Sequence, residues 1–284
     1  VTRTDLTLTN GTTYYISVRS TDNVGNVSSV ASSDGITIDT DAPTIASVVE
    51  GSATSGSANT YSLSFDGSDD YVNVAALSQT IVNSNATLMG WFKPDHIPVT
   101  GHDGIFGFRN YPNHNSSFYT AINANGDYLE NVYYDNQANI YETLNDSSWY
   151  HIALTMDGST LNAYLNGQLL SSVGVSTLIN DPSIDLLIGL NVSNYENYYN
   201  GHIDEVSLWS QALSESEIQS YMSTSPGGSE TGLVGYWNFN EGTGTTLTDQ
   251  TANGNDGTIY GATWSDDVPA ASTGGGDADY QNVA

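Results

Sequence analysis

The amino-acid sequence predicts an all-β fold. Along most of the 284 residues, apolar and polar side chains alternate with a period of two, which is typical of strands that bury one face. The turn sequences "MDGST" (156–160) and "LNGQ" (165–168) separate alternating runs and favour tight hairpins. One convincing helix, "LSESEIQSYMS" (213–223), interrupts this pattern. Its Ser214 and Glu217 have capping-box spacing, and Ile218, Tyr221 and Met222 form an apolar stripe.

The charge balance is strongly acidic and limits the possible partners. Lys and Arg total 4 against 32 Asp and Glu, which gives a net charge of −28. Such a field repels nucleic acid and anionic lipid, and it repels anionic polysaccharides unless a divalent cation or salt intervenes. The composition therefore excludes nucleic acid as a partner, and no apolar run is long enough for membrane insertion.

The chain contains no cysteine and begins with Val1 rather than Met. A cysteine-free chain rich in Ser, Thr, Asn and Tyr is typical of a bacterial exoprotein rather than a disulfide-stabilised animal one. We therefore expect a piece of a larger secreted, multidomain bacterial protein, located extracellularly or at the cell surface.

Residues 1–45 form a first segment. "TYYISVRSTDNVGNVSSV" (13–30) alternates and turns at residues 22–26, and "DTDAPT" (39–44) ends the unit. These phrases resemble the last strands of a fibronectin type III domain. A complete domain of that kind needs about 100 residues, so the segment is a partial domain. Residues 46–60 are rich in Gly and Ser and are expected to be a linker.

Residues 61–270 carry three phrases in a specific order: "LSFDGSDDYV" (63–72), "SSWYHIALTMDGSTLNAYLNGQLL" (147–170) and "GHIDEVSLWSQALSESEIQSYM" (201–222). Together they resemble the laminin-G-like domains of the concanavalin A-like lectin/glucanase superfamily. The resemblance implies an antiparallel jelly-roll β-sandwich. We expect five aromatic residues in strands to pack between its sheets: Trp91, Phe92, Trp149, Trp209 and Trp237.

The segment "LVGYWNFNEGTGTTLTDQTANGNDGTIYGATW" (233–264) stands near the end of the chain. In domains of the family it resembles, such a segment often precedes the "LSFDG" strand. Either it completes the same sandwich, which we favour, or it opens a second copy. Residues 271–284 are expected to be a flexible tail.

The same segment contains a candidate calcium loop. "DQTANGNDG" (249–257) alternates oxygen-bearing side chains before Gly254, as in the opening of a calcium-binding loop. Tyr260 stands where an EF-hand has Glu, so a complete EF-hand is excluded. Relatives of the laminin-G type often hold a structural Ca²⁺, although Asx-turns in polar loops would explain the pattern equally. The candidate ligands are Asp249, Thr251, Asn253, Asn255, Asp204, Asp66 and Asp69.

Catalysis receives little support from the sequence. Glucanases that share this fold use carboxylates one strand-spacing apart, and no E-x-D-x-E phrase occurs. Asp204 and Glu205 are adjacent on a strand and are expected to point to opposite faces, with Asp204 on the face of Val206 and Leu208. His151 is expected to be structural. We therefore expect a non-catalytic domain.

Binding of a glycan receives more support. Tyrosine-rich, Asn-rich connections offer flat rings that stack on sugars and amides that bond to hydroxyls. The alternative is that these tyrosines only cover loops. The candidate binding residues are Arg109, Tyr111, His114, Tyr133, Tyr134, Tyr195, Tyr198 and Tyr199.

The sequence thus favours an extracellular carbohydrate-binding or adhesion module that recognises a polysaccharide, a cell-surface glycan or a protein adhesion partner. Two alternatives stay open. The chain could be an accessory module of a polysaccharide-degrading enzyme, or a spacer without a ligand in an adhesin array.

Overall fold

The structure is a computed structural model. It describes residues 7, 9–10, 12–33, 36–37, 59–75, 77, 85–98, 100–109, 117–123, 126–134, 136–176, 184–191 and 197–270. Contacts divide the chain into two units, Val1–Thr54 and Ser55–Ala284. The predictions for Tyr111, His114 and Tyr195, for the 271–284 tail and for nearly all of the linker fall outside the described residues.

The first unit contains two short antiparallel pairs. Strand β1 (Thr13–Tyr14) pairs with β4 (Ile36–Thr37), and β2 (Ser17–Val18) pairs with β3 (Ala31–Ser32). The predicted turn at Asp22 is present, because its Oδ1 accepts the backbone N–H groups of Val24 and Asn26 at 3.0 and 2.9 Å. No side chain described in residues 7–33 is buried. The fibronectin type III resemblance of this unit stays a prediction.

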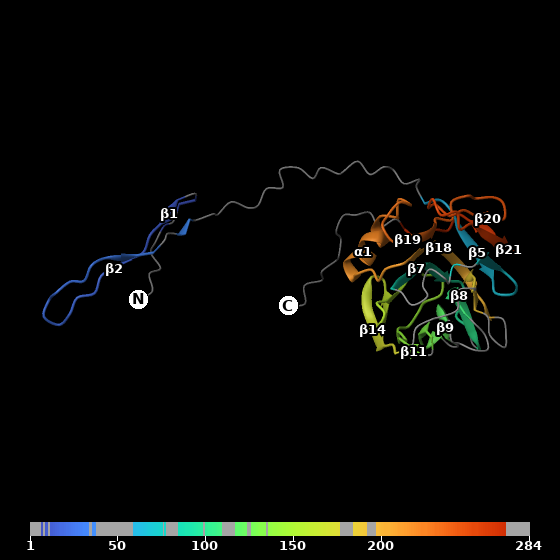
Figure 1. Ribbon diagram of the computed structural model, residues 1–284, viewed down its shortest axis with the longest axis horizontal. Coiled ribbons are helices and arrows are strands. Elements are labelled where there is room, and N and C mark those ends of the chain that lie inside the picture. The colour runs from blue at the N-terminus through green and yellow to red at the C-terminus, as the bar shows by residue number, and fades with distance from the viewer. Residues whose placement is uncertain are drawn as a thin grey trace. The chain divides into compact units, whose positions relative to one another are not determined.

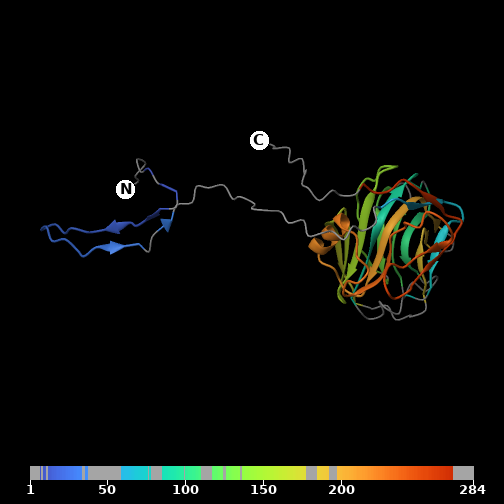
Figure 2. The ribbon, with the colours of Figure 1, turned by 90° about the horizontal axis from the view of Figure 1, so that it is seen from above.

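The second unit is a sandwich of two sheets, and all of their strand pairs are antiparallel (Figures 1 and 2). Sheet 1 contains, in order across the sheet, β14 (Gln168–Gly174), β13 (Thr160–Leu165), β12 (Tyr150–Met156), β7 (Ala86–Pro94), β18 (Asn200–Trp209), β5 (Ser62–Asp66) and β22 (Thr263–Ser265), with β19 (Leu233–Trp237) also beside β18.

Sheet 2 contains, in order, β11 (Asn136–Gln137), β10 (Leu129–Tyr133), β9 (Phe118–Asn123), β8 (His102–Phe108), β15 (Leu186–Ile188), β6 (Tyr71–Val74), β21 (Gly257–Tyr260) and β20 (Thr246–Leu247). A separate small pair joins β16 (Leu190–Asn191) to β17 (Asn197–Tyr198). The predicted all-β antiparallel sandwich is therefore confirmed.

The core lies between the two sheets and follows from the two-residue period of the strands. Leu63 and Phe65 of β5 and Val72 and Val74 of β6 all point into one cluster of buried apolar side chains. This cluster stabilises the sandwich by removing apolar surface from water.

Only part of the predicted aromatic core is correct. Phe92 and Trp237 are fully buried between the sheets. Trp91 is partly exposed, because its neighbour Phe92 faces inward and alternation turns Trp91 outward. Trp149 precedes β12 and is also partly exposed, and Trp209 is buried in a separate cluster.

That separate cluster lies under helix α1 (Glu215–Ser223), on the outer side of sheet 1 (Figure 2). The predicted capping box is present: Ser214 accepts from the backbone N–H of Glu217, and the Glu217 carboxylate accepts from the backbone N–H of Ser214. Ile218 is the buried anchor of the helix, and Trp209 packs against Tyr221 with ring centroids 4.7 Å apart.

Residues 233–264 contribute strands to both sheets of this unit. Strand β19 pairs with β18 so that Trp237 lies opposite Val206. Strand β21 pairs with β6, and β22 pairs with β5. In the structure the segment is thus part of the same sandwich.

A β-bulge at Glu205 changes the faces predicted for β18. Glu205 has a φ of 52°, and the register with β7 shifts between Asp204 and Ser207. Ile203 and Val206 both face the inter-sheet core, so Asp204 points outward, opposite Trp91. The prediction that Asp204 shares a face with Val206 and Leu208 is wrong.

The two carboxylates of this bulge also lie on the same side of sheet 1, against the prediction of opposite faces. Asp204 accepts from Asn59 Nδ2 at 2.7 Å, and Glu205 accepts from Tyr236 Oη at 2.6 Å, on the side covered by α1. Burial raises the pKa of Asp204 well above its usual range, and the neighbouring Glu205 adds to this effect. Asp204 is fully buried.

We expect Gly107→Ala to destabilise the sandwich by about 3 kcal/mol, as overpacking does. Gly107 has a φ of 148°, and an added Cβ would lie 2.3 Å from Cα of Tyr119 on the adjacent strand. Gly174→Ala is the matched control, since a Cβ there has no atom within 4 Å. Urea unfolding of both variants measures the difference. Equal stability of the two would contradict the packing described here.

The half-buried Asp103 generates a pH prediction. Burial raises its pKa from 3.8 to about 7, so the folded state favours the protonated acid. The folded state binds the proton of Asp103 more tightly than the unfolded state does. The stability that this difference contributes is complete below the unfolded pKa of 3.8 and is lost as pH rises to about 7. We therefore expect Asp103→Asn to gain stability relative to the wild type as pH rises from 4.5 to 8. Unfolding curves at both pH values test this, with the exposed Asp127→Asn as the control.

Candidate functional site

The outer face of sheet 2 carries a row of side chains that point away from the core. Val72 and Val74 face inward, so Asn73 between them faces outward, and it lies opposite Leu187 of β15. Leu187 lies opposite Gly107 of β8, and Gly107 lies opposite Tyr119 of β9. Because Gly107 has no side chain, the row is interrupted at its centre.

An open recess of about 300 Å³ lies on this side of the molecule. Its size is at the lower end of the range for small-molecule sites. It is lined by Tyr71, Asn73, Arg109, Ile184, Asp185, Leu187, Leu190 and Tyr198.

Tyrosine rings form one border of the recess. Tyr71 of β6 stacks on Tyr260 of β21, with ring centroids 4.6 Å apart and planes inclined by 13°. Tyr198 lies next to them, with its centroid 6.5 Å from that of Tyr71. Tyr260 is 46 % exposed, so the stack offers an aromatic surface to solvent. We call Tyr71, Tyr198 and Tyr260 the tyrosine platform.

Polar groups border the other side. Asn73 Nδ2 donates to Asp185 Oδ2 at 2.9 Å. Arg109 Nη1 donates to Asn191 Oδ1 at 2.6 Å, and the guanidinium lies over the ring of Tyr119 at 4.8 Å from its centroid. Flat rings and directional polar groups therefore converge on the same recess.

The recess includes two of the predicted binding residues, Arg109 and Tyr198. The predictions for Tyr133 and Tyr199 are wrong, because both side chains are fully buried and pack edge-on against Phe118 and Phe65. Tyr133 is in β10, where it shares the core face with Leu129, and Tyr199 stands between β17 and β18.

Tyr134 also lies away from the recess. It stands at the turn after β10 with a φ of 58°, half-buried against the core cluster. The sequence reasoning missed Tyr71, Asn73, Asp185 and Tyr260. The alternation in "YVNV" (71–74) and "GTIY" (257–260) could have indicated Tyr71, Asn73 and Tyr260 as outward-facing.

The family relationship agrees with this architecture. Residues 66–219, more than half of the chain, match the family model described as the concanavalin A-like lectin/glucanase superfamily, of the laminin-G type. The chain belongs to this superfamily. The resemblance stated for residues 61–270 is thus confirmed at the level of the family. No curated protein sequence matches the chain.

Solved structures of the same fold include a candidate carbohydrate-binding protein from Bacteroides ovatus. It is 21 % identical with a TM-score of 0.58, and the match covers 92 % of this chain and 71 % of that one. A heptameric pentraxin from Limulus polyphemus is 16 % identical (TM-score 0.45, 57 % and 82 % covered). Domain 4 of an extracellular arabinanase from Geobacillus stearothermophilus, in complex with arabinotriose, is 19 % identical (TM-score 0.40, 49 % and 66 % covered).

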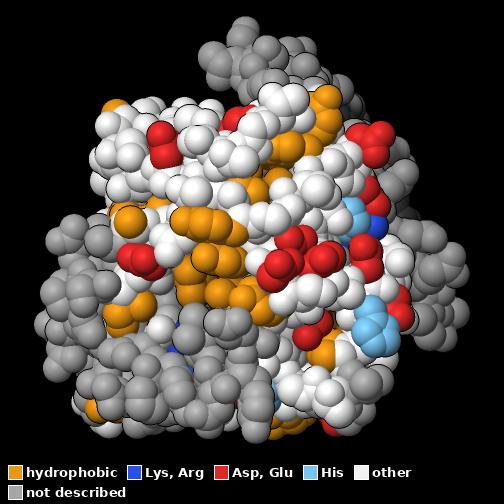
Figure 3. Space-filling model, turned by 90° about the vertical axis from the view of Figure 1, so that its right-hand side faces the viewer, with side chains coloured by type: hydrophobic (Ala, Val, Ile, Leu, Met, Phe, Trp, Pro, Cys, Tyr) orange, Lys and Arg blue, Asp and Glu red, His pale blue; other side chains and the backbone are white. Residues whose placement is uncertain are grey.

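An acidic turn adjoins the tyrosine platform of this superfamily member. Asp66, Asp69 and Asp70 have carboxylate oxygens within 4.8 Å of one another, and Asp70 immediately precedes Tyr71. Burial raises the pKa of Asp70, and repulsion from Asp66 and Asp69 contributes. Figure 3 shows acidic side chains gathered beside a band of hydrophobic ones on one face of the molecule. The oxygen donors fit a hard cation such as Ca²⁺.

The predicted calcium loop at Asp249 has a different local structure. The buried Asp249 carboxylate accepts from Tyr236 N, Thr251 N, Thr251 Oγ1 and Asn255 N at 2.8–3.1 Å. Asp249 thus holds the loop by hydrogen bonds, as the Asx-turn alternative proposes.

Two asparagines of the same loop point their amides at the adjacent strand. The Nδ2 atoms of Asn253 and Asn255 both donate to Val234 O, at 2.9 and 2.8 Å. Within the described residues, Asp249 and Asp204 join no group of three carboxylates like that of the acidic turn. Calcium binding stays a prediction, and Asp66 and Asp69 are the two predicted ligands whose carboxylates lie together.

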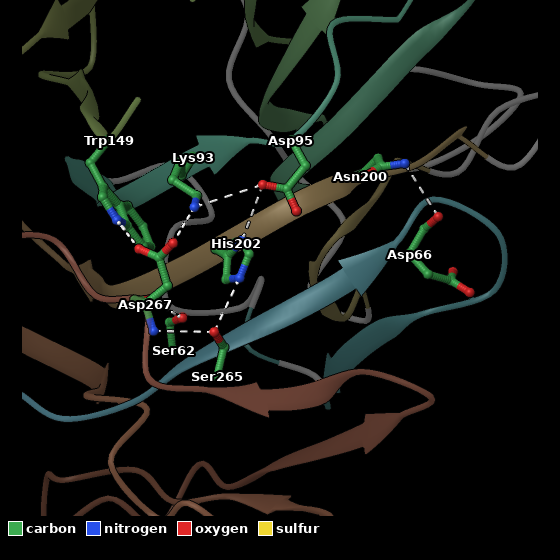
Figure 4. A network of polar contacts seen from close by, with 9 residues as sticks. All are labelled: Ser62, Asp66, Lys93, Asp95, Trp149, Asn200, His202, Ser265 and Asp267. Atoms are coloured by element: carbon green, nitrogen blue, oxygen red, sulfur yellow. Dashed lines mark hydrogen bonds and ion pairs between the residues drawn. The ribbon is translucent and has the colours of Figure 1, made fainter. Parts of the chain in front are cut away.

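A network of hydrogen bonds and ion pairs on the outer face of sheet 1 holds the C-terminal end of the domain in place (Figure 4). Asp267 binds the buried Lys93 ammonium and accepts from Trp149 Nε1 at 3.0 Å. His202 bonds Ser265 Oγ at 3.2 Å and lies 3.5 Å from Asp95. Burial lowers the pKa of His202. These groups bind one another, so the network has a structural role.

His151 is buried in sheet 1, with its ring edge-on to Trp91. Burial lowers its pKa to about 3, so it is neutral at physiological pH, as a structural histidine would be. In the described part of the chain, no helix has the length and apolar character of a membrane span.

We expect Asp249→Ala to lower the free energy of unfolding by about 3 kcal/mol, because four donors lose their acceptor. The loss should be the same with calcium and with a chelator. The exposed Gln250→Ala is the control. A loss seen only in calcium would instead make Asp249 a metal ligand.

Proposed function

We propose that residues 59–270 form a carbohydrate-binding module and that the recess beside the tyrosine platform is its binding site. The observation that carries this proposal is the stack of Tyr71 on Tyr260, with one ring partly exposed, beside the polar pair Asn73 and Asp185. Sugar rings present C–H faces to aromatic surfaces and hydroxyls to amides and carboxylates.

Membership of a superfamily of lectins and glucanases supports this proposal. The fold shared with the Bacteroides ovatus candidate carbohydrate-binding protein supports it at the level of architecture. In this proposal the module is non-catalytic, because Asp185 is the one carboxylate among the described residues that line the recess, and two-carboxylate hydrolysis needs a pair. The proposal also places the module outside the cell. Its acidic composition is suited to high salt, and its lack of cysteine is typical of a bacterial exoprotein.

We include a structural Ca²⁺ at the acidic turn in this proposal. Asp66 and Asp69 are exposed and hold like charges close together, and a divalent cation would relieve their repulsion. Because Tyr71 follows this turn, the cation would hold the start of β6 and with it one ring of the platform. Chelation would then weaken glycan binding.

We expect Tyr71→Ala to weaken binding of a recognised polysaccharide about tenfold, since one stacking surface is lost. Affinity electrophoresis through a panel of neutral and anionic polysaccharides, with calcium and with chelator, is the test. The matched control is Tyr141→Ala, because Tyr141 is 74 % exposed and packs against a tyrosine, Tyr128, that does not line the recess. Equal mobility of both variants and the wild type in the retarding polymer would disprove the site. Retardation by none of the polymers would disprove the function.

A further inference from the structure

Cations are scarce in this chain, and the two described in the sandwich differ in their partners. The whole sequence has 4 Lys and Arg residues. Lys93 is buried and forms ion pairs with Asp95 and Asp267. Arg109 lines the recess, and among the described residues no carboxylate oxygen lies within ion-pair distance of its guanidinium.

The hydrogen bonding of Arg109 is also incomplete among the described residues. Nη1 donates to Asn191 Oδ1, and the guanidinium plane is held against Tyr119. Nε is buried and finds no acceptor among the described residues. A guanidinium has five N–H donors in a fixed fork. The contacts with Asn191 and Tyr119 position the Arg109 side chain and leave some of these donors unused.

The carboxylates in this region bind other donors. Glu130 accepts from Tyr119 Oη and Gln137 Nε2, both at 3.1 Å, and Asp185 accepts from Asn73. In a protein of net charge −28, an arginine without an ion-pair partner is unexpected. A partly buried cation without an anion is also unfavourable, and a ligand anion would remove that penalty.

We propose that the recess takes a sugar residue that carries an anionic group, a carboxylate or a sulfate ester, and that Arg109 binds this group. The inference rests on the proposed function of the recess and specifies the class of glycan. The anion would receive hydrogen bonds from the guanidinium fork, while the tyrosine platform packs on the ring.

Long-range electrostatics oppose such a ligand, and this defines the role of Arg109. The net charge repels a polyanion at a distance, and salt shortens the range of that repulsion to a few Å near 1 M. Arg109 therefore acts at contact, as a specificity-determining residue rather than as a source of attraction from a distance. The structure predicts selectivity for charged sugars under salt that screens the rest of the molecule.

The test uses the whole chain at one high salt concentration and three polymers: a polyuronate, the same polymer after reduction of its carboxyl groups to alcohols, and a sulfated galactan. We expect the wild type to bind the polyuronate or the sulfated polymer at least about tenfold tighter than the reduced polymer, the size of a hydrogen bond to a charged group. Arg109→Gln should lower the affinity for the charged polymer to that for the reduced one. The two charged polymers distinguish a carboxylate from a sulfate ligand.

Arg19→Gln is the matched control, because it removes the same charge from an exposed position in the other unit. Equal losses for Arg19→Gln and Arg109→Gln would overturn the inference. It would also be overturned if the wild type bound the reduced polymer as tightly as the charged one. In that case the proposed carbohydrate-binding function would stand, whereas binding to none of the polymers would disprove that function itself.

Arg109→Lys covers the case in which Arg109→Gln does not fold. Lysine keeps the charge but lacks the planar fork. We expect it to weaken binding of the charged polymer and to leave binding of the reduced polymer unchanged. An equal loss for both polymers would make Arg109 a structural residue and overturn the inference.

Discussion

The pairing of β5 and β6 with the C-terminal strands is the constraint on which the sandwich depends. Strands β5 and β6 follow each other along the chain but lie in different sheets. Strand β22 pairs with β5 in sheet 1, and β21 pairs with β6 in sheet 2, so one C-terminal segment extends both sheets. Trp237 of β19 then fills the core between them. The platform follows from this pairing, because Tyr71 and Tyr260 stack only when β6 and β21 are neighbours.

The two-residue period made most of the fold predictable, and its local breaks account for the failures. Alternation and turn sequences indicated the strands and hairpins, the family resemblance implied the sandwich, and the capping-box spacing indicated the helix at Ser214. Asp204 was assigned to the wrong face because Glu205 adopts a positive φ, which no short-range pattern in "HIDEVSLW" signals. Composition alone suggests surface positions for Tyr133 and Tyr199, but both side chains are buried. Alternation in β10 turns Tyr133 inward, whereas Tyr199 is buried at the junction of β17 and β18, which no alternating pattern signals.

The candidate site was less predictable, because it joins distant segments. Tyr71, Arg109, Asp185 and Tyr198 come from four separate parts of the chain and meet only when β6, β8 and β15 are adjacent. The acidic turn was more accessible to sequence reasoning, since Asp66, Asp69 and Asp70 lie within five residues. The loop at Asp249 shows the converse: spacing typical of cation binding also suits a carboxylate that organises backbone N–H groups.

The antiparallel pairing of β5 with β22 also has a mechanical consequence. Ser62, at the start of β5, lies opposite Ser265, at the end of β22, so the two ends of the sandwich emerge side by side. A force that pulls these ends apart loads the hydrogen bonds of this pair one after another, like a zipper, rather than all at once in shear. On the C-terminal side, the contacts of Asp267 with Lys93 and Trp149 are the first to bear that load. They help to determine how much tension the module withstands before its edge strand, β22, separates from β5.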